Sequence, residues 1–305
     1  MISGGPQSQV GGQPGLRRPR RRYQRAAAVF SGLIVGNTGY GAEASDRAFS
    51  REWIAPRIEE VAFHSEALGR EMKAVVVHPR EDGSTQPVLF LLHGRGRNRR
   101  SLVDLPDVRH QFLAADCWVV LPDGDDGWYI DSPANPADRY NAYLEEVITR
   151  LTTLFRLNPD TARRAIAGWS MGGYGAVRFA ETHPKQFGVV VSILGLLDFP
   201  RDETLPPHRN YPVPVARFGS DAATWRRFNP LYGVGQLRGK SLQVITASDA
   251  FDSVMNQNFS AALDAVGIEH EFRRLPGSHT LDVVRAALPG VLEFVARKTS
   301  GAGSK

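Results

Sequence analysis

Short, uninterrupted hydrophobic runs alternate along the chain with longer segments whose apolar residues recur at helical spacing. A run in which every residue is apolar, such as residues 88–92, is typical of a strand covered on both faces of a sheet. Apolar residues at a period near 3.6, as in residues 140–155, are typical of an amphipathic helix. Strands that alternate with helices predict an α/β fold with a mostly parallel central sheet, helices on both faces and right-handed crossovers.

The predicted elements cover most of the chain from residue 61 onward. A hairpin over residues 61–78, with 72–77 as its second strand, is expected to enter the sheet. Further strands are expected at residues 88–92, 117–121, 164–167, 188–194, 242–246 and 271–275, and further helices at residues 259–266 and 283–296. Residues 196–240 interrupt the alternation with prolines, a tryptophan and arginines. We interpret them as an insertion or lid over the carboxyl ends of the strands.

One serine stands between a predicted strand and a predicted helix. The pentapeptide GWSMG at residues 168–172 follows the strand and precedes a small-residue, then apolar segment that ends before His183 and Pro184. Glycines on both sides of the serine remove the Cβ atoms that would clash where the chain reverses. This order is typical of a nucleophile elbow, and it predicts that Ser170 is a catalytic nucleophile rather than part of a structural turn.

A serine hydroxyl is a weak nucleophile until a base removes its proton and an acid orients that base. After a nucleophile elbow, the acid and then the base follow the serine along the chain. His279 lies in a loop between the strand at 271–275 and the last helix, and we expect it to be the base. His270 begins that strand and is expected to be structural.

Two aspartates follow the predicted strand at residues 242–246. Asp249 lies closer to the strand end, and we expect it to orient His279. Asp252 is the alternative, because a loop can present either residue. In the preferred interpretation, Asp252 caps the segment that follows it.

An oxyanion intermediate needs two N–H donors. One is expected from the backbone of Met171, directly after the nucleophile, and the other from the backbone of Arg95, between two glycines in HGRGR at residues 93–97. The side chains of four arginines in this region either attract an anionic acyl or leaving group or form a solvated basic loop. They are Arg95, Arg97, Arg99 and Arg100.

Residues 123–129, DGDDGWY, resemble a calcium-binding loop only superficially. They lack the later bidentate acid at the required spacing, so no metal site is predicted. We interpret the segment as a turn that carries Trp128 and Tyr129 into the pocket, where Trp169 is also expected to contact substrate.

The formal net charge of +5 comes from the first 44 residues. They hold six of the 37 basic residues and one of the 32 acidic ones, which leaves 31 of each in residues 45–305. The absence of net charge in residues 45–305 argues against nucleic acid as a partner. Cys117 is the sole cysteine of the sequence, which excludes an intramolecular disulfide.

The leader, residues 1–44, has the order of a secretory signal. A basic stretch at 17–25 precedes a mildly apolar stretch at 26–41 and a small-x-small site at 42–44, which predicts cleavage after Ala44 and an exported domain of residues 45–305. The apolar part is too short and glycine-rich for a good membrane span. Two arginines before Tyr23 loosely resemble a twin-arginine signal, which leaves the export route open. A disordered basic tail or a transit peptide is the alternative interpretation.

Four motifs together resemble the esterase D-like family of α/β-hydrolases. They are LLHG at residues 91–94, PDG and GWY within 122–129, GWSMGGYGA at 168–176, and the Asp249 loop with Gly-x-His at 277–279. That family includes S-formylglutathione hydrolases, feruloyl and acetylxylan esterases, and the antigen 85 mycolyltransferases. The resemblance covers roughly residues 60–298. It implies an α/β-hydrolase fold and serine esterase chemistry without metal or cofactor.

Two positions depart from the family pattern. Leu194 precedes Gly195 where members often have a serine, and Leu281 stands where many have a tryptophan. Both differences change the pocket rather than the catalytic residues. The predicted export also disagrees with the formylglutathione activity, which is cytosolic.

The leading hypothesis is an exported carboxylic-ester hydrolase that acts on a small-molecule or saccharide ester through an acyl-serine intermediate. An acyltransferase that passes the acyl group to a sugar or another alcohol is the alternative, because the two differ only in whether water or an alcohol attacks in the second step. A non-catalytic binding protein on the same fold is the third hypothesis.

Overall fold

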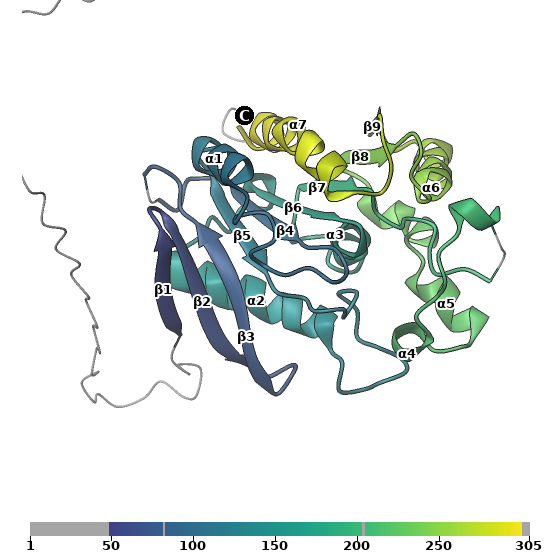
Figure 1. Cartoon of the computed structure of the whole chain (residues 1–305), viewed down its shortest axis with the longest axis horizontal. Coiled ribbons are helices and arrows are strands. Elements are labelled where there is room, and N and C mark those ends of the chain that lie inside the picture. The colour runs from purple at the N-terminus through teal and green to yellow at the C-terminus, as the bar shows by residue number, and fades with distance from the viewer. Residues whose placement is uncertain (1–48, 82, 203–204, 301–305) are drawn as a thin grey trace, which may run out of the picture. The chain divides into compact units, whose positions relative to one another are not determined.

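The computed structural model describes residues 49–81, 83–202 and 205–300 (Figure 1), so the predicted leader lies outside the described residues. Within these residues, nine strands form one sheet in the order β1-β2-β3-β5-β4-β6-β7-β8-β9. The strands from β5 through β9 in this order are parallel, and β1, β2 and β3 extend the sheet in antiparallel fashion. The predicted α/β fold with a mostly parallel sheet is confirmed.

The strands and helices have the following bounds. The strands are β1 (Ser50–Ala55), β2 (Ile58–Ser65), β3 (Arg70–Val77), β4 (Val88–Leu92), β5 (Trp118–Pro122), β6 (Arg164–Trp169), β7 (Val189–Ile193), β8 (Ser241–Ala247) and β9 (Glu271–Leu275). The α-helices are α1 (Pro106–Ala114), α2 (Tyr140–Phe155), α3 (Met171–Thr182), α4 (Val215–Phe218), α5 (Ala222–Phe228), α6 (Ser253–Ala265) and α7 (Leu281–Ser300). Short 3-10 turns lie at Thr161–Arg163, Pro207–Arg209, Pro230–Tyr232 and Val234–Leu237.

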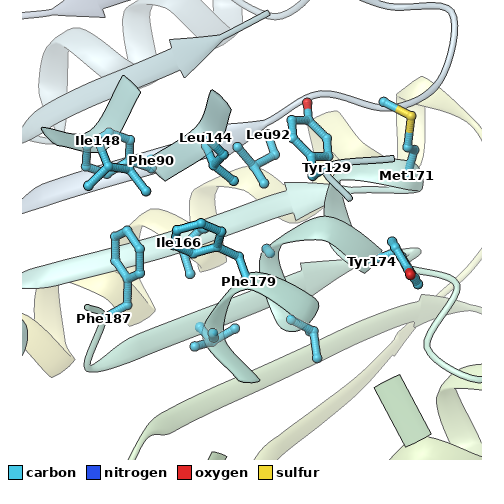
Figure 2. Close-up of a cluster of buried hydrophobic side chains, with 14 of the residues drawn as sticks. Phe90, Leu92, Tyr129, Leu144, Ile148, Ile166, Met171, Tyr174, Phe179 and Phe187 are labelled. Carbon is cyan, nitrogen blue, oxygen red and sulfur yellow. The ribbon is translucent and has the colours of Figure 1, made fainter. Parts of the chain in front are cut away.

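Helices cover the sheet on both faces, which explains why β4 and β5 are apolar at every position. Along β4, Phe90 belongs to the hydrophobic cluster with α2, α3 and α6, whereas Leu89 belongs to the cluster with α1 and α7. Figure 2 shows the first cluster, in which Ile166 of β6 lies near Phe179 of α3. Because successive side chains of a strand point to opposite faces, a strand covered on both sides needs no polar position.

Residues 196–240 connect β7 to β8, and the described part of this insertion adds no strand to the sheet. It is attached to α3, the helix that follows Ser170. The Tyr174 hydroxyl donates to the carbonyl of Phe228 at 2.7 Å, and the Arg178 guanidinium donates to the carbonyl of Arg227 at 3.1 Å. The insertion is therefore joined to the element that carries the candidate nucleophile.

Most predicted elements are confirmed, and the differences have local causes. The sequence pattern missed β1, because this edge strand is largely exposed and lacks an apolar face. It also missed α1, which buries only Val108 and Phe112. Helix α6 begins at Ser253, earlier than the predicted residue 259. No helix in the described part of the chain is both long enough and apolar enough to cross a membrane.

Candidate active site

Ser170 occupies the sharp turn between β6 and α3, at the carboxyl end of β6. Its φ of 56° and ψ of −120° lie in a region that residues other than glycine rarely adopt. Gly168 and Gly172 flank Ser170, and other backbone atoms approach both of them too closely to leave room for a side chain. A Cβ at Gly168 would lie 2.2 Å from the carbonyl oxygen of Gly172, and one at Gly172 would lie 2.2 Å from that of Leu92. The local conformation is that of a nucleophile elbow.

Three side chains form a continuous hydrogen-bonded chain at this turn. His279 Nε2 lies 2.8 Å from Ser170 Oγ, and His279 Nδ1 lies 2.6 Å from Oδ1 of Asp252. A carboxylate at Nδ1 favours the neutral tautomer with its proton on that nitrogen. Nε2 then has a free lone pair, which can accept the proton of the serine hydroxyl.

The structure contradicts the choice of Asp249 as the partner of His279. Asp249 is exposed, and its carboxylate accepts a hydrogen bond from the Ser248 hydroxyl at 3.0 Å. Asp252, the alternative, is fully buried and contacts the imidazole. Its side chain makes no capping hydrogen bond to α6, so the expected capping role is also wrong. The distance of each aspartate from the end of β8 does not decide which of them contacts His279. The chain turns twice between β8 and α6, and the second turn brings Asp252 to the imidazole.

Asp252 is fixed by donors on three sides of its carboxylate. Besides the imidazole at Oδ1, the Thr246 hydroxyl donates to Oδ2 at 2.9 Å and the Asn256 amide donates to Oδ2 at 2.8 Å. Arg209 of the insertion holds the same loop by contacting the carbonyl of Ala250 and the Ser253 hydroxyl. These hydrogen bonds satisfy both oxygens of a buried carboxyl group, whose burial without partners would be costly.

His93 controls the backbone of the loop that follows β4. Its Nδ1 lies 2.8 Å from the carbonyl oxygen of Gly94, which can only accept, and its Nε2 lies 2.8 Å from the N–H of Gly124, which can only donate. These partners define the neutral tautomer with the proton on Nδ1. Burial lowers the pKa of His93, which also favours the neutral form.

The hydrogen bond from His93 to the Gly94 carbonyl sets the direction of the N–H group of Arg95. In a trans peptide the C=O and N–H groups point in opposite directions, so the N–H of Arg95 points away from the His93 ring. The N–H of Met171 belongs to the first turn of α3, where backbone donors have no acceptor within the helix. Gly94 lies against the elbow, because a Cβ there would approach Ser170 Cβ to 3.2 Å. The two candidate oxyanion donors therefore come from adjacent segments.

A cavity of about 500 Å³ opens over Ser170 and His279. Trp169 lines it, as expected, together with the Arg95 loop. Trp128 and Tyr129 do not line it. Both are 1% exposed and belong to the hydrophobic core, where Figure 2 shows Tyr129 among the buried side chains of the sheet and helices. Their expected role in substrate contact is wrong, because the turn carries them inward rather than toward the pocket.

Two aromatic residues that the sequence pattern did not single out line the cavity instead. Phe251 stacks on the His279 ring with centroids 4.5 Å apart, and Tyr211 of the insertion stacks on Phe251 at 5.4 Å. The Tyr211 hydroxyl accepts a hydrogen bond from Arg95 at 2.9 Å. The sequence offered one indication of this aromatic stack, which is that Phe251 directly precedes Asp252. Tyr211 lies in the insertion, far from any motif.

The acidic residues of the 123–129 segment contact neighbouring side chains and backbone. Asp123 accepts from the Arg99 guanidinium at 2.7 Å, Asp125 accepts from the Tyr140 hydroxyl at 2.7 Å, and Asp126 accepts from the Gly96 N–H at 2.8 Å. No group of three or more histidine, cysteine or acidic side chains in the described ranges is arranged to hold a metal ion. His270, expected to be structural, contacts the Ser260 hydroxyl at 2.6 Å rather than Ser170.

A mostly parallel sheet with a serine elbow and a histidine that follows the last strand defines the α/β-hydrolase class. Within that class the chain belongs to the Esterase family ("Putative esterase"), whose pattern matches residues 65–294. The family resemblance noted from the motifs is confirmed.

The chain is similar in sequence to several known proteins and in fold to several solved structures. Esterase Rv1288 of Mycobacterium tuberculosis is 27% identical over 90% of this chain, and the match spans 66% of that protein. The diacylglycerol acyltransferase/mycolyltransferase Ag85A of Mycobacterium gordonae is 29% identical over 72% of this chain and 67% of its own length. An S-formylglutathione hydrolase from Agrobacterium tumefaciens has a similar fold, with a TM-score of 0.68 and 20% identity over 82% of this chain and 98% of that one.

Proposed function

We propose that the protein is a serine carboxylic-ester hydrolase that works through an acyl-serine intermediate. The observation that carries the proposal is the chain of contacts from Ser170 Oγ to His279 Nε2 at 2.8 Å and from His279 Nδ1 to Asp252 at 2.6 Å. Membership of the Esterase family supports the same chemistry. The proposed substrate is a small-molecule or saccharide ester.

In the first half-reaction, Ser170 Oγ attacks the ester carbonyl carbon as His279 Nε2 takes the hydroxyl proton. The carbonyl oxygen becomes an oxyanion, for which we propose the N–H groups of Arg95 and Met171 as donors. The tetrahedral intermediate then collapses, the bond to the alcohol oxygen breaks, and His279 returns the proton to that oxygen. Asp252 holds the imidazole in the productive tautomer throughout.

In the second half-reaction, water replaces the departed alcohol. His279 takes a proton from the water as its oxygen attacks the acyl-serine carbonyl, and the same donors stabilise the second oxyanion. Collapse of this intermediate releases the carboxylic acid and returns the proton to Ser170 Oγ. The Ser170 proton leaves with the alcohol and a proton from water replaces it, so water is the one co-reactant and the catalytic residues end as they began.

The test is a panel of 4-nitrophenyl esters of graded acyl length, assayed with the unaltered protein and with Ser170→Ala. We expect the variant to fold normally and to lose a factor of about 10³ or more in kcat, because it lacks only the nucleophilic oxygen. Circular dichroism is the control for folding. Unchanged turnover by a clean preparation of Ser170→Ala would remove Ser170 from the mechanism.

An acyltransferase is the second candidate, favoured by the similarity to Ag85A over 72% of this chain. It would use the same acyl-serine intermediate and pass the acyl group to a sugar or another alcohol. Product analysis with added alcohol acceptors separates the two. A hydrolase releases mainly free acid, whereas a transferase forms new ester in proportion to the acceptor.

We further propose that the protein is exported to the periplasm, the cell envelope or the medium. The basic, apolar and small-residue order of residues 1–44 supports this location, and the neutral balance of charges in residues 45–305 offers no general attraction for nucleic acid.

A further inference from the structure

The catalytic cavity has two chemically different sides. One side is apolar and consists of Leu194, Leu281 and Val284, which belong to or pack against the hydrophobic cluster beneath α1 and α7. Such a surface suits an apolar part of a substrate, because contact there removes apolar area from water on both partners.

The other side is polar and is built by loops that follow the strands on the opposite side of β6 from Leu194. Arg95 and Arg97 follow β4, and Asp126 follows β5, whereas Leu194 follows β7. Because the sheet order is β5-β4-β6-β7, the backbone of the two arginines and the backbone of Leu194 follow strands on opposite sides of β6, the strand that precedes Ser170. A substrate bound across Ser170 therefore meets both surfaces.

The four arginines of the 95–100 region differ in their partners. Three of them are paired with carboxylates. Arg95 contacts Asp126 at 3.4 Å, Arg99 contacts Glu60 and Asp123 at 2.7 Å each, and Arg100 contacts Asp104 at 2.9 Å. These pairs satisfy the positive charges within the protein.

Arg97 is the exception in this group, and it lines the cavity. Among the described residues, no acidic side chain forms an ion pair with its guanidinium, and its backbone N–H is held by the carbonyl of Gly94 at 3.2 Å. Asp126, the acidic residue on the same side, already accepts hydrogen bonds from the Gly96 N–H and from Arg95. The polar side thus carries one positive charge that the surrounding protein leaves unneutralised.

We infer that Arg97 binds an anionic group, a carboxylate or a phosphate, on the ester substrate, while an apolar part of the same substrate lies against Leu194, Leu281 and Val284. This inference rests on the proposed esterase function and specifies its substrate class. Guanidinium groups suit such partners, because their planar donors match the oxygens of carboxylate and phosphate. The site is open to solvent, so the expected contribution is moderate and sensitive to salt.

The test compares anionic and neutral esters of matched shape. The first pair places the charge on the acyl part, with 4-nitrophenyl hydrogen adipate against 4-nitrophenyl methyl adipate. The second pair places it on the alcohol part, with 3-acetoxybenzoate against 3-acetoxybenzamide. For each pair the ratio of kcat/KM values, anionic over neutral, is measured for the unaltered protein, Arg97→Gln and Arg80→Gln. Arg80 is a matched control, because it is an exposed arginine outside the cavity.

We expect Arg97→Gln to lower this ratio roughly fivefold in at least one pair, the size of a solvent-exposed charge pair, and Arg80→Gln to leave it unchanged. The pair that responds identifies the part of the substrate that carries the charge. The preference should also weaken as salt is added. Equal ratios in all three proteins for both pairs would overturn the inference.

A binding measurement keeps the inference separate from the esterase proposal. Calorimetry with Ser170→Ala and with Ser170→Ala/Arg97→Gln compares monomethyl adipate, which is anionic, with neutral dimethyl adipate. We expect only the anion to bind more weakly to the double variant. If the unaltered protein hydrolyses none of the esters, the esterase proposal fails, and this measurement still decides the role of Arg97. Equal binding of the anion by both variants would refute it.

Discussion

Ser170 has a backbone conformation that costs about 1–3 kcal/mol for a residue other than glycine. The cost is offset by its surroundings, because Met171 and Tyr174 in the first turn of α3 are completely buried. Its N–H group also donates to the carbonyl of Ile193 at 2.9 Å. The strained turn therefore persists without substrate, and it keeps Oγ within reach of His279 before any ester binds.

The position of the acid leads to a prediction that ranks two substitutions. Asp252→Asn should lower kcat by about 10⁴-fold, because the amide favours the wrong imidazole tautomer. Asp249→Asn should have little effect, because Asp249 contacts Ser248 at the surface and not His279. Steady-state kinetics on one 4-nitrophenyl ester measures both. A larger loss in Asp249→Asn than in Asp252→Asn would contradict the observed geometry.

His93 should act as a positioning residue for the oxyanion donor of Arg95. His93→Ala removes the bond to the Gly94 carbonyl, so we expect kcat to fall about tenfold or more, with a smaller change in KM, since the donor acts mainly in the transition state. Affinity for a boronic acid, which forms a tetrahedral anion on the serine, should fall in parallel.

His93→Asn is the matched control for this prediction. Its amide can still donate to the Gly94 carbonyl, so it should recover part of the lost kcat and boronate affinity. A purely structural role would instead lower the thermal stability of both variants and leave boronate affinity unchanged in the folded protein.

At the scale of elements, α3 links the nucleophile to the insertion through a buried carboxyl group. Glu181, near the carboxyl end of α3, is buried beneath the insertion, where a Cβ at Gly233 would lie 2.5 Å from its carboxyl carbon. Its Oε2 accepts from Arg178, while its Oε1 is buried with no hydrogen-bond partner. Burial raises the pKa of Glu181 to about 8, although the Arg178 charge opposes this shift.

This raised pKa predicts the sign of a pH effect on stability. Between the ordinary pKa of 4.5 and about 8, the native state binds more protons at Glu181 than the unfolded chain does. The stabilisation is complete below 4.5 and is lost as the pH rises through about 8. Glu181→Gln should remove this dependence, a slope of up to about 1.4 kcal/mol per pH unit. Urea unfolding of both proteins at pH 5, 6.5 and 8 measures it, and parallel pH dependences would show that Glu181 is ionised in the native state.

The elements that sequence patterns predict well are those in which burial determines composition. The strand Val88–Leu92 and the helix Tyr140–Phe155 match their predicted bounds. Burial on both faces gives the strand a continuous apolar run, and burial along one side gives the helix apolar residues at a period near 3.6. Glycine spacing predicted the turn at Ser170 for an equally local reason. Asp252 and His279 are 27 residues apart, and their pairing is supported by hydrogen bonds from Thr246 and Asn256 to Asp252 and by Arg209 of the insertion. Individual hydrogen bonds of this kind leave no periodic pattern in the sequence.

At the scale of the whole molecule, the sheet and the catalytic cavity lie within residues 50–300. We therefore expect a protein that begins at Ser45 to keep the ester turnover and thermal stability of the full chain. The exported protein should itself begin near Ser45, which mass spectrometry of the secreted fraction measures. An intact leader on active protein in the soluble cytoplasmic fraction would contradict the proposed export.

The separation of the catalytic residues along the chain has a consequence for the cell that makes the protein. Ser170 and His279 are 109 residues apart, and α7, which follows His279, packs back onto β6 and β7. Translation adds about 5–20 residues per second, so the nucleophile exists for roughly 5–20 seconds before its base is added. An unfinished polypeptide therefore cannot cleave the esters of its own host. The order of residues along the chain delays activity until synthesis has passed His279.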